Sequence, residues 1–289
     1  MEKEGMKTIR NAEFEGERPL FESHNLRLEN VTVHQGESAI KECSNIEAVG
    51  CRFEGNYPFW HVHGFVIERC FFDVGGRSAL WYSDHLRMTD TVIDAPKMFR
   101  EMTDITIDNV EMNDADEVFW RCDRLNIRRL KLHGGTYPFL FSRNIYIDGL
   151  ESDSKYVFQY VKNLELHNAR ITTKDALWES EDVTVYDSEL NGEYLGWHSR
   201  NLRLVNCRIS GTQPLCYADN LTLENCTMAD DCDLAFEYST VNATVNGPIR
   251  SVKNPRSGSI TAGSYGEIII DKNIKAPADC ELRLRDGQA

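Results

Sequence analysis

One combination of ionisable side chains occurs twice in this chain of 289 residues, each time at intervals of about twenty residues. It reads Glu-His-Tyr-Glu and consists of Glu42, His61, Tyr82 and Glu101, and again of Glu179, His198, Tyr217 and Glu237. Histidine and tyrosine can act as base and acid in proton transfer when they lie close together. Residues on neighbouring strands of a sheet are about 5 Å apart. If the interval places them so, we expect His61 to act as a base and Tyr82 as an acid.

Charged residues accompany the first combination. We expect Glu42 and Glu101 to orient a substrate or to act as acids, and Arg100 and Arg121 to neutralise a substrate anion, as an elimination reaction requires. Glu42 and Glu101 would lie three repeats apart, about 14 Å. Because the paired carboxylates of glycosidases are at most about 9.5 Å apart, a glycosidase built on this pair is disfavoured.

The tryptophans occupy one place in the pattern, directly before these ionisable positions. All five are Trp60, Trp81, Trp120, Trp178 and Trp197. A row of indole rings beside polar groups can bind sugars by stacking, and Glu179, His198 and Tyr217 are expected to contribute to the same binding surface. Aromatic residues also favour sheets for structural reasons. The direction of the tryptophan side chains therefore decides between a binding surface and a core.

The elements that would position these side chains are repeats of 19 to 21 residues. Their first apolar residues are Leu26, Ile46, Phe65, Leu86, Ile105, Leu125, Ile145, Leu164, Val183, Leu202 and Leu221, with a weaker one at Val241. A Leu-x-Leu pair alternates as a strand does. Asn, Asp or Gly follows, and these residue types tolerate the left-handed backbone of a sharp turn. A second strand, a polar connection and an aromatic third β-like segment complete the repeat.

Three short strands per repeat, without helical periodicity, predict an all-β fold. We expect a single-stranded, right-handed parallel β-helix of about twelve coils, in which each strand pairs with its counterpart one repeat away. A single domain is expected over residues 1–289, with regular coils over 7–246 and irregular last coils and a C-terminal cap over 247–289. A cap is expected because an open end would expose unpaired backbone groups.

The order of strand, one-residue Asn turn, strand, longer turn and strand resembles the β-helix of the pectate-lyase-like superfamily. Phrases such as Glu17–Ser23, Tyr57–His61 and Ser251–Arg256 resemble an uncharacterised bacterial family of such proteins, over essentially the full chain. The resemblance implies the fold and leaves the activity open, because that family has no established activity. In the superfamily, active sites lie on the face of the segment that precedes Leu-x-Leu. The motifs of its polygalacturonases and the calcium-binding aspartates of its pectate lyases are not found.

The charge and the composition of the chain exclude several classes of binding partner. A net charge of −14 and a pI near 5.1 argue against nucleic acid and against an acidic membrane surface. We expect no cofactor and no metal, since His61 and His63 are more typical of polar residues at a strand end than of ligands. The nine cysteines are not in ligand or disulfide spacings and are expected as reduced thiols stacked in the core. No signal peptide is recognised, so we expect the cytoplasm.

These features favour a carbohydrate-binding or carbohydrate-active protein. It would bind an oligosaccharide along the tryptophan face, and cleavage by a lyase or hydrolase reaction is left open. The alternative is a non-catalytic binding or scaffold protein that uses the aromatic face for a protein partner or for self-association. A homo-oligomer is therefore also open. The sequence does not decide whether the protein is an enzyme.

Overall fold

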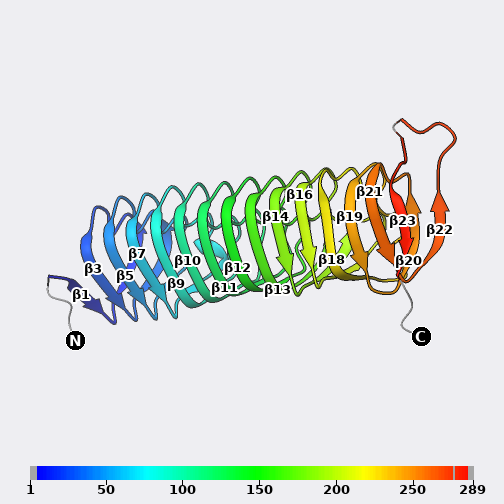
Figure 1. Ribbon diagram of the computed structural model, residues 1–289. Helices are drawn as coiled ribbons and strands as arrows, with labels where there is room; N and C mark the ends of the chain where they lie inside the picture. Colours follow the sequence, from blue (N-terminus) through cyan, green and yellow to red (C-terminus); the bar gives the residue numbers. More distant parts are fainter. Residues whose placement is uncertain (1–4, 276, 286–289) are drawn as a thin grey trace. The chain divides into compact units, whose positions relative to one another are not determined.

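The computed structural model describes residues 5–275 and 277–285. The chain divides into two compact units, Met1–Ile147 and Asp148–Ala289, termed the N-terminal and C-terminal units. Each is built from short strands that stack along the chain (Figure 1). The helical segment found in the described residues is one 3₁₀ turn, η1 (Val74–Gly76), which follows the capping residue Asp73. No helix in this described part is long and apolar enough to cross a membrane.

The strands of the N-terminal unit are β1 (Lys7–Arg10), β2 (Glu13–Glu17), β3 (His24–Glu29), β4 (Thr32–Glu37), β5 (Ser44–Val49), β6 (Arg52–Phe53), β7 (His63–Glu68), β8 (Phe71–Phe72), β9 (Asp84–Ile93), β10 (Thr103–Met112) and β11 (Asp123–Leu132). The strand β12 (Arg143–Ser152) contains the division between the units. The strands of the C-terminal unit are β13 (Lys162–Lys174), β14 (Glu181–Tyr186), β15 (Glu189–Glu193), β16 (Arg200–Val205), β17 (Arg208–Ser210), β18 (Leu221–Met228), β19 (Thr240–Val245), β20 (Pro248–Lys253), β21 (Ser257–Ala262), β22 (Ser264–Ile269) and β23 (Glu281–Leu284).

Within each unit, strands pair in parallel with their counterparts one repeat away. In the N-terminal unit Leu26 pairs with Ile46, and Ile46 with Phe65. In the C-terminal unit Leu164 pairs with Val183. The predicted all-β parallel β-helix is therefore confirmed. The described residues form about 15 turns rather than about twelve, because β1 before the predicted coils and β21 and β23 after them also pair with their neighbours.

A single left-handed residue separates the first two strands of a repeat, as the Asn, Asp and Gly positions predicted. Asn30 and Asn109 have φ of 52° and 57°. Their side chains also bond between repeats, since Asn109 Nδ2 donates to Asp90 Oδ1 over 2.6 Å. Arg69 and Arg129 depart from the residue pattern but keep this conformation, each with φ of 49°. The turn is therefore kept even where the residue type does not favour it.

In most repeats the third segment is not a strand, so the prediction of a third β-like element is wrong there; in the last repeats that segment includes β20, which bridges to Ala235 and pairs with β22. In the other repeats left-handed residues recur in this segment at every second position, as at Tyr137, Phe139 and Phe141 with φ of 59°, 65° and 58°. The backbone still bonds between repeats, since the Phe139 N–H donates to the Val118 carbonyl over 2.9 Å. A left-handed conformation costs a non-glycine residue about 1–2 kcal/mol. These hydrogen bonds and the burial of apolar side chains offset that cost.

This backbone also changes which side chains face inward. Neighbouring residues of a strand point to opposite sides, but Pro58 and Phe59 are both buried and Trp60 is half-buried. Tyr82, one place further along its own repeat than Trp81, is 39% exposed. The tryptophans therefore lie at the boundary between core and surface.

Stacked apolar side chains fill the interior of the N-terminal unit. Phe99, Phe119 and Phe139 lie in consecutive turns, with ring centroids 4.5 Å and 4.7 Å apart and nearly parallel planes. Eight of the nine cysteines are buried free thiols. Two of them are adjacent, because the Cys51 N–H donates to the Cys70 sulfur over 3.3 Å. The prediction of thiols in the core is confirmed for these eight cysteines, whereas Cys280 is half-buried.

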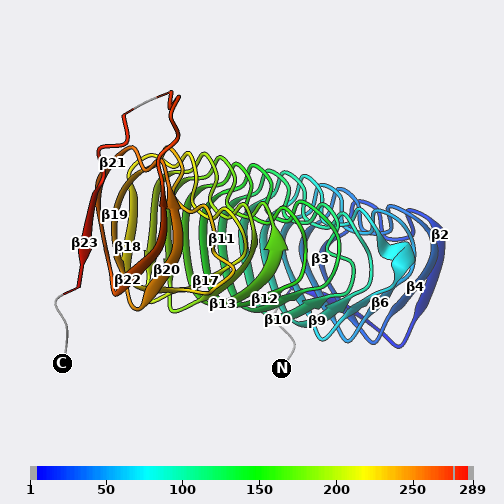
Figure 2. The same cartoon turned by 90° about the vertical axis from the view of Figure 1, so that its right-hand side faces the viewer.

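Regular pairing continues past residue 246, where irregular coils and a cap were predicted. The strand β20 pairs with β22, and β21 with β23, and Figure 2 shows β20 and β22 next to one another at the C-terminal end of their unit. Ile268 on β22 is 52% exposed. The single domain remains a prediction, and residues 1–4, 276 and 286–289 lie outside the described residues.

Candidate functional site

The first predicted cluster lies on consecutive turns of the N-terminal unit. Glu42, His61, Tyr82 and Glu101 all have a left-handed backbone, with φ between 51° and 56°. The structure brings His61 and Tyr82 together with ring centroids 5.4 Å apart and planes 25° apart. Stacked rings touch through their faces and not through the imidazole nitrogens and the hydroxyl. The pair is therefore not arranged to pass a proton between its members.

The tryptophans of this unit form a stack that includes an arginine. Trp60 and Trp81 are 5.4 Å apart with planes at 11°. The Arg100 guanidinium lies 4.4 Å from the Trp81 ring centroid and 5.0 Å from that of Trp120. The Trp81 Nε1 donates to the Lys97 carbonyl over 2.7 Å. Because neighbours cover both faces of Trp81, a sugar ring cannot stack on it as the sequence suggested.

The two arginines predicted to neutralise a substrate anion have different surroundings. Arg100 Nη2 bonds to Glu117 Oε2 over 2.8 Å, so its charge is already paired. Arg121 is exposed and lies 5.7 Å from the Phe141 ring centroid. Glu101, Arg121 and Phe141 line a shallow hollow of about 470 Å³. Arg121 alone of the two remains accessible.

The second predicted cluster has a related arrangement in the C-terminal unit. Trp178 and Trp197 stack 5.4 Å apart, and His198 and Tyr217 stack 4.9 Å apart. Burial, together with the charge of Glu237, raises the pKa of the Tyr217 hydroxyl above its ordinary value. Glu179 is exposed at the neighbouring turn. The cluster is therefore another stacked aromatic ladder.

The histidines considered as metal ligands have different partners. His63 Nδ1 bonds to Asp84 Oδ2 over 2.8 Å, whereas His61 stacks on Tyr82. Among the residues that the structure describes, no three His, Cys, Asp or Glu side chains are grouped as metal ligands.

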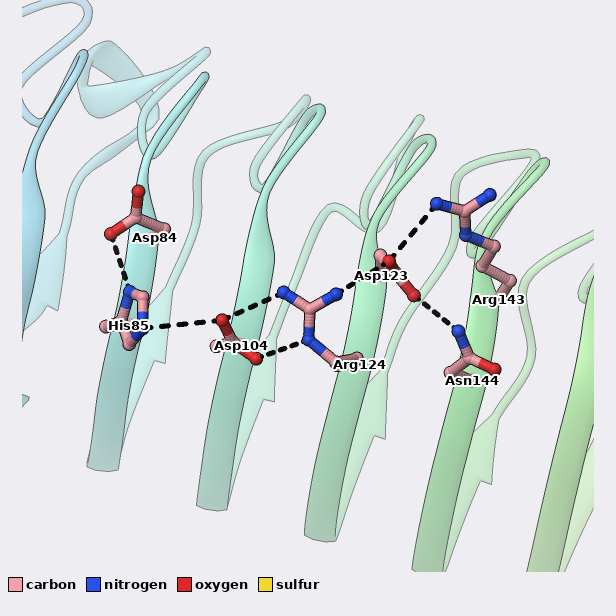
Figure 3. Close-up of polar contacts among 7 residues, drawn as sticks. All are labelled: Asp84, His85, Asp104, Asp123, Arg124, Arg143 and Asn144. Carbon is pink, nitrogen blue, oxygen red and sulfur yellow. Dashed lines mark hydrogen bonds and ion pairs between the residues drawn. The ribbon is translucent and has the colours of Figure 1, made fainter.

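A polar network that the sequence reasoning missed lies where β9, β10, β11 and β12 begin (Figure 3). Arg124 pairs with Asp104 through two bonds of 2.6 Å and 3.0 Å, and with Asp123 over 2.9 Å. Asp123 also accepts from Asn144 over 2.6 Å and from Arg143 over 3.2 Å. Burial alone would raise the pKa of Asp123, but these hydrogen bonds and guanidinium charges outweigh it and hold that pKa below its ordinary value.

At the other end of the network, Asp84 lies between two histidines. Its Oδ1 is 2.7 Å from His85 Nδ1 and its Oδ2 is 2.8 Å from His63 Nδ1. The hydrogen bond to Asp84 raises the pKa of His85 above 6.5. Burial raises the pKa of Asp84, but the bonds from both histidines outweigh it and lower that pKa below 3.8. His63 is 61% exposed and has its other nitrogen, Nε2, open to a ligand.

The pKa shifts give a testable pH dependence. A raised His85 pKa stabilises the fold below pH 6.5, and this contribution is lost as the pH rises through the folded-state value. A lowered Asp84 pKa stabilises it above pH 3.8, and this is lost as the pH falls. We expect Asp84→Asn to lower the His85 titration midpoint towards 6.5 in NMR spectra. The remote Asp187→Asn is the control, and a midpoint unchanged in Asp84→Asn would contradict the assignment.

A groove opens beside this network at Gly64. By register, Gly64 occupies the position of Asn45 in the repeat before it and of His85 in the repeat after it. Asn45 Nδ2 donates to Asn25 Oδ1 over 2.7 Å, and Gly64 interrupts this row because it has no side chain. The resulting groove has a volume of about 570 Å³, and His63 and Arg87 also line it.

These columns could have been read from the sequence. The residues one and two places before each Leu-x-Leu are mostly Asn, Asp, His and Arg, and in the first of these columns Gly64 is the one residue without a side chain. Only the columns four to six places before were considered, because they contain the aromatic residues. The site in the structure lies in the two columns directly before Leu-x-Leu.

Stacked parallel turns with a polar surface network define a parallel β-helix protein. The chain belongs to the family described as Protein of unknown function (DUF3737), whose family model matches residues 7–283. This confirms the resemblance to an uncharacterised β-helix family. Comparison with curated proteins finds no match.

Solved structures of similar fold include three with different descriptions. They are the Streptococcus pneumoniae surface protein and adhesin PfbA (6% identity, TM-score 0.36, 96% of this chain and 91% of that chain), the tailspike protein of E. coli bacteriophage HK620 in complex with pentasaccharide (9%, 0.36, 90% and 67%), and the periplasmic alginate epimerase AlgG (12%, 0.35, 97% and 74%). At these identities and TM-scores the likeness concerns the fold, and the function must be argued from the site.

Proposed function

We propose that this protein binds an oligosaccharide in the groove at Gly64. The observation that carries the proposal is the missing side chain at Gly64, which opens a hollow in an otherwise continuous row of polar side chains. The hollow lies on the outside of the strands β5, β7 and β9. A chain of sugar residues can extend along such an open groove without having to enter a closed cavity.

The groups in the groove suit sugar hydroxyls. Asn45 and Asp104 offer amide and carboxylate atoms, and His63 and His85 offer ring nitrogens. Val66 adds an apolar patch that the C–H groups of a sugar ring can cover. Planar polar groups beside a small apolar surface match the alternating polar and apolar character of a pyranose.

Preorganisation of these side chains supports the proposal further. Asp84 fixes both histidine rings through their Nδ1 atoms, and Arg124 fixes Asp104. A ligand that binds rigid groups loses less conformational entropy on ordering them. The hydrogen bond to Asp84 raises the pKa of His85 and so favours its protonated form. We therefore also propose that His85 can transfer a proton to a bound sugar. A cytoplasmic location remains a prediction.

The test is a glycan array followed by NMR of the isotope-labelled protein with the best ligand. We expect chemical-shift changes at Gly64, His63 and His85, and none at the indole N–H groups of Trp178 and Trp197. Chemical-shift changes concentrated on the tryptophans would show that the ligand binds at the stacked aromatic residues and not in the groove. If no glycan binds and the protein self-associates instead, the alternative of a scaffold protein replaces this proposal.

A further inference from the structure

Arg87 on β9 is a charged side chain that the folded protein leaves unpaired. It is exposed and lines the Gly64 groove, and within the described residues no carboxylate lies within ion-pair distance of it. It also contacts no aromatic ring there. In a chain with a net charge of −14, such an arginine places an uncompensated positive charge at the groove.

Two other arginines of the N-terminal unit show how such a charge can be paired. Arg27 occupies the same column as Arg87 and bonds to Glu29 over 2.5 Å and to Glu47 on the next turn. Arg129 pairs with Asp108 over 2.7 Å. Each of these two arginines thus has a carboxylate on the same strand or on a neighbouring turn. Among the described residues Arg128 on β11, like Arg87, has no carboxylate within ion-pair distance, but it does not line the groove.

The strand register places no carboxylate in the corresponding positions beside Arg87. Its neighbours in the same column are Val66 on one side and Thr106 on the other. Two residues along its own strand stands Thr89, where Arg27 has Glu29. Asp108, on the diagonal, is held by Arg129. Two other carboxylates line a hollow together with Arg87, and neither lies within ion-pair distance of it: Glu68 is held by Arg69, and Asp90 accepts a hydrogen bond from Asn109.

The acidic groups of the groove are paired as well. Glu47 is held by Arg27 and Asp104 by Arg124. An incoming anion therefore meets carboxylates whose charge is compensated, beside a guanidinium whose charge is not. A guanidinium also presents a planar pair of N–H donors that fits a carboxylate.

We infer that the Gly64 groove binds an acidic sugar, whose carboxylate pairs with Arg87 while its hydroxyls bond to Asn45, His63 and His85. The inference rests on the proposed function, since it names the ligand class for that groove. The residue that would recognise a substrate anion is then Arg87 and not Arg100, whose charge Glu117 neutralises.

The experiment uses tetrasaccharides of galacturonic, glucuronic and mannuronic acid, each beside its carboxyl-reduced neutral counterpart, in calorimetric titrations of the full chain. Wild type should bind one acidic member at least about tenfold more tightly than its neutral counterpart, the size expected for hydrogen bonds to a charged group. Arg87→Gln should remove this difference. Arg208→Gln, an exposed arginine of the C-terminal unit, makes the same charge change as a control.

The outcomes separate the two proposals. Equal binding of acidic and neutral sugars, or an Arg87→Gln variant that keeps the preference, overturns the inference and leaves oligosaccharide binding standing. Absence of binding by any sugar of the panel and of the glycan array overturns both. A preference lost equally in Arg208→Gln reflects overall charge and also overturns the inference.

Discussion

Replacing Gly64 by asparagine is expected to abolish oligosaccharide binding while leaving the fold intact. The new side chain would stand between Asn45 and His85 and fill the middle of the groove. A ligand that follows the groove would lose its central contacts, and we expect its dissociation constant to rise about a hundredfold or more, equivalent to about 2.8 kcal/mol. Calorimetric titration with the best glycan measures this loss.

The fold should accept the substitution because the backbone already suits asparagine. Gly64 has φ of 67°, and a Cβ built there meets no atom within 4 Å. Asn45, in the same position of the preceding repeat, has φ of 52° and bonds to the Asn25 side chain. An asparagine at 64 can donate to Asn45 in the same way. The left-handed backbone destabilises an asparagine at this position, whereas the new hydrogen bond and the lower entropy of the unfolded chain stabilise the variant. Because these contributions nearly cancel, the unfolding free energy should change by less than about 1 kcal/mol.

Gly134→Asn provides a matched control in the same unit. Gly134 has φ of 62° and equally open surroundings, but it does not line the groove. We expect both variants to unfold at similar urea concentrations and only Gly64→Asn to lose binding. Binding retained by Gly64→Asn, or lost equally in both variants, would place the ligand elsewhere.

The Leu-x-Leu columns could be predicted because burial repeats with the period of the turn. Residues such as Leu26, Ile46 and Phe65 are apolar wherever the chain returns to the same place in the interior. A parallel strand then pairs each with its counterpart, so the register follows from the sequence interval. The Asn turns were predictable for a related reason, because residue type there reports a left-handed backbone.

The third segment could not be predicted in this way. Phe119, Leu177 and Tyr160 are left-handed, yet none of these residue types signals such a conformation. Their backbone is fixed by hydrogen bonds to neighbouring turns, a tertiary effect that local propensity does not contain. The direction of the indoles could not be predicted for the same reason, since strand alternation does not apply there. Trp60 and Trp81 stack on one another at the boundary between core and surface.

The groove could be predicted from the sequence only in part. With the register known, the absence of a side chain at Gly64 and of a partner for Arg87 can be read by aligning repeats. What the alignment does not show is which side chains actually pair. Arg100 and Arg87 both look free in the sequence, and only the structure shows that Glu117 is bound to Arg100. The valine and the threonine beside Arg87 follow from the register.

Replacing Phe119 by alanine should give the largest loss of stability in the N-terminal unit. Its ring is fully buried between those of Phe99 and Phe139, at 4.5 Å and 4.7 Å. Removing it leaves a cavity that the neighbouring turns cannot close, because hydrogen bonds fix their spacing. Truncating a buried phenylalanine costs about 3–5 kcal/mol. Urea unfolding, followed by circular dichroism, measures the change.

The variant Phe141→Ala is a control that separates the effect of side-chain burial from that of the left-handed backbone. Phe141 has φ of 58°, against 56° for Phe119, and is also in the third segment of its repeat, but its side chain is 45% exposed. An alanine at either site carries a similar left-handed cost, so only burial distinguishes them. We expect Phe141→Ala to change the unfolding free energy by less than about 1 kcal/mol. Similar losses in both variants would show that the left-handed backbone, and not the stacked core, limits the stability of the turns. In a solenoid each repeat contacts chiefly its neighbours, so hydrogen exchange should then accelerate mainly in the turns around Phe119.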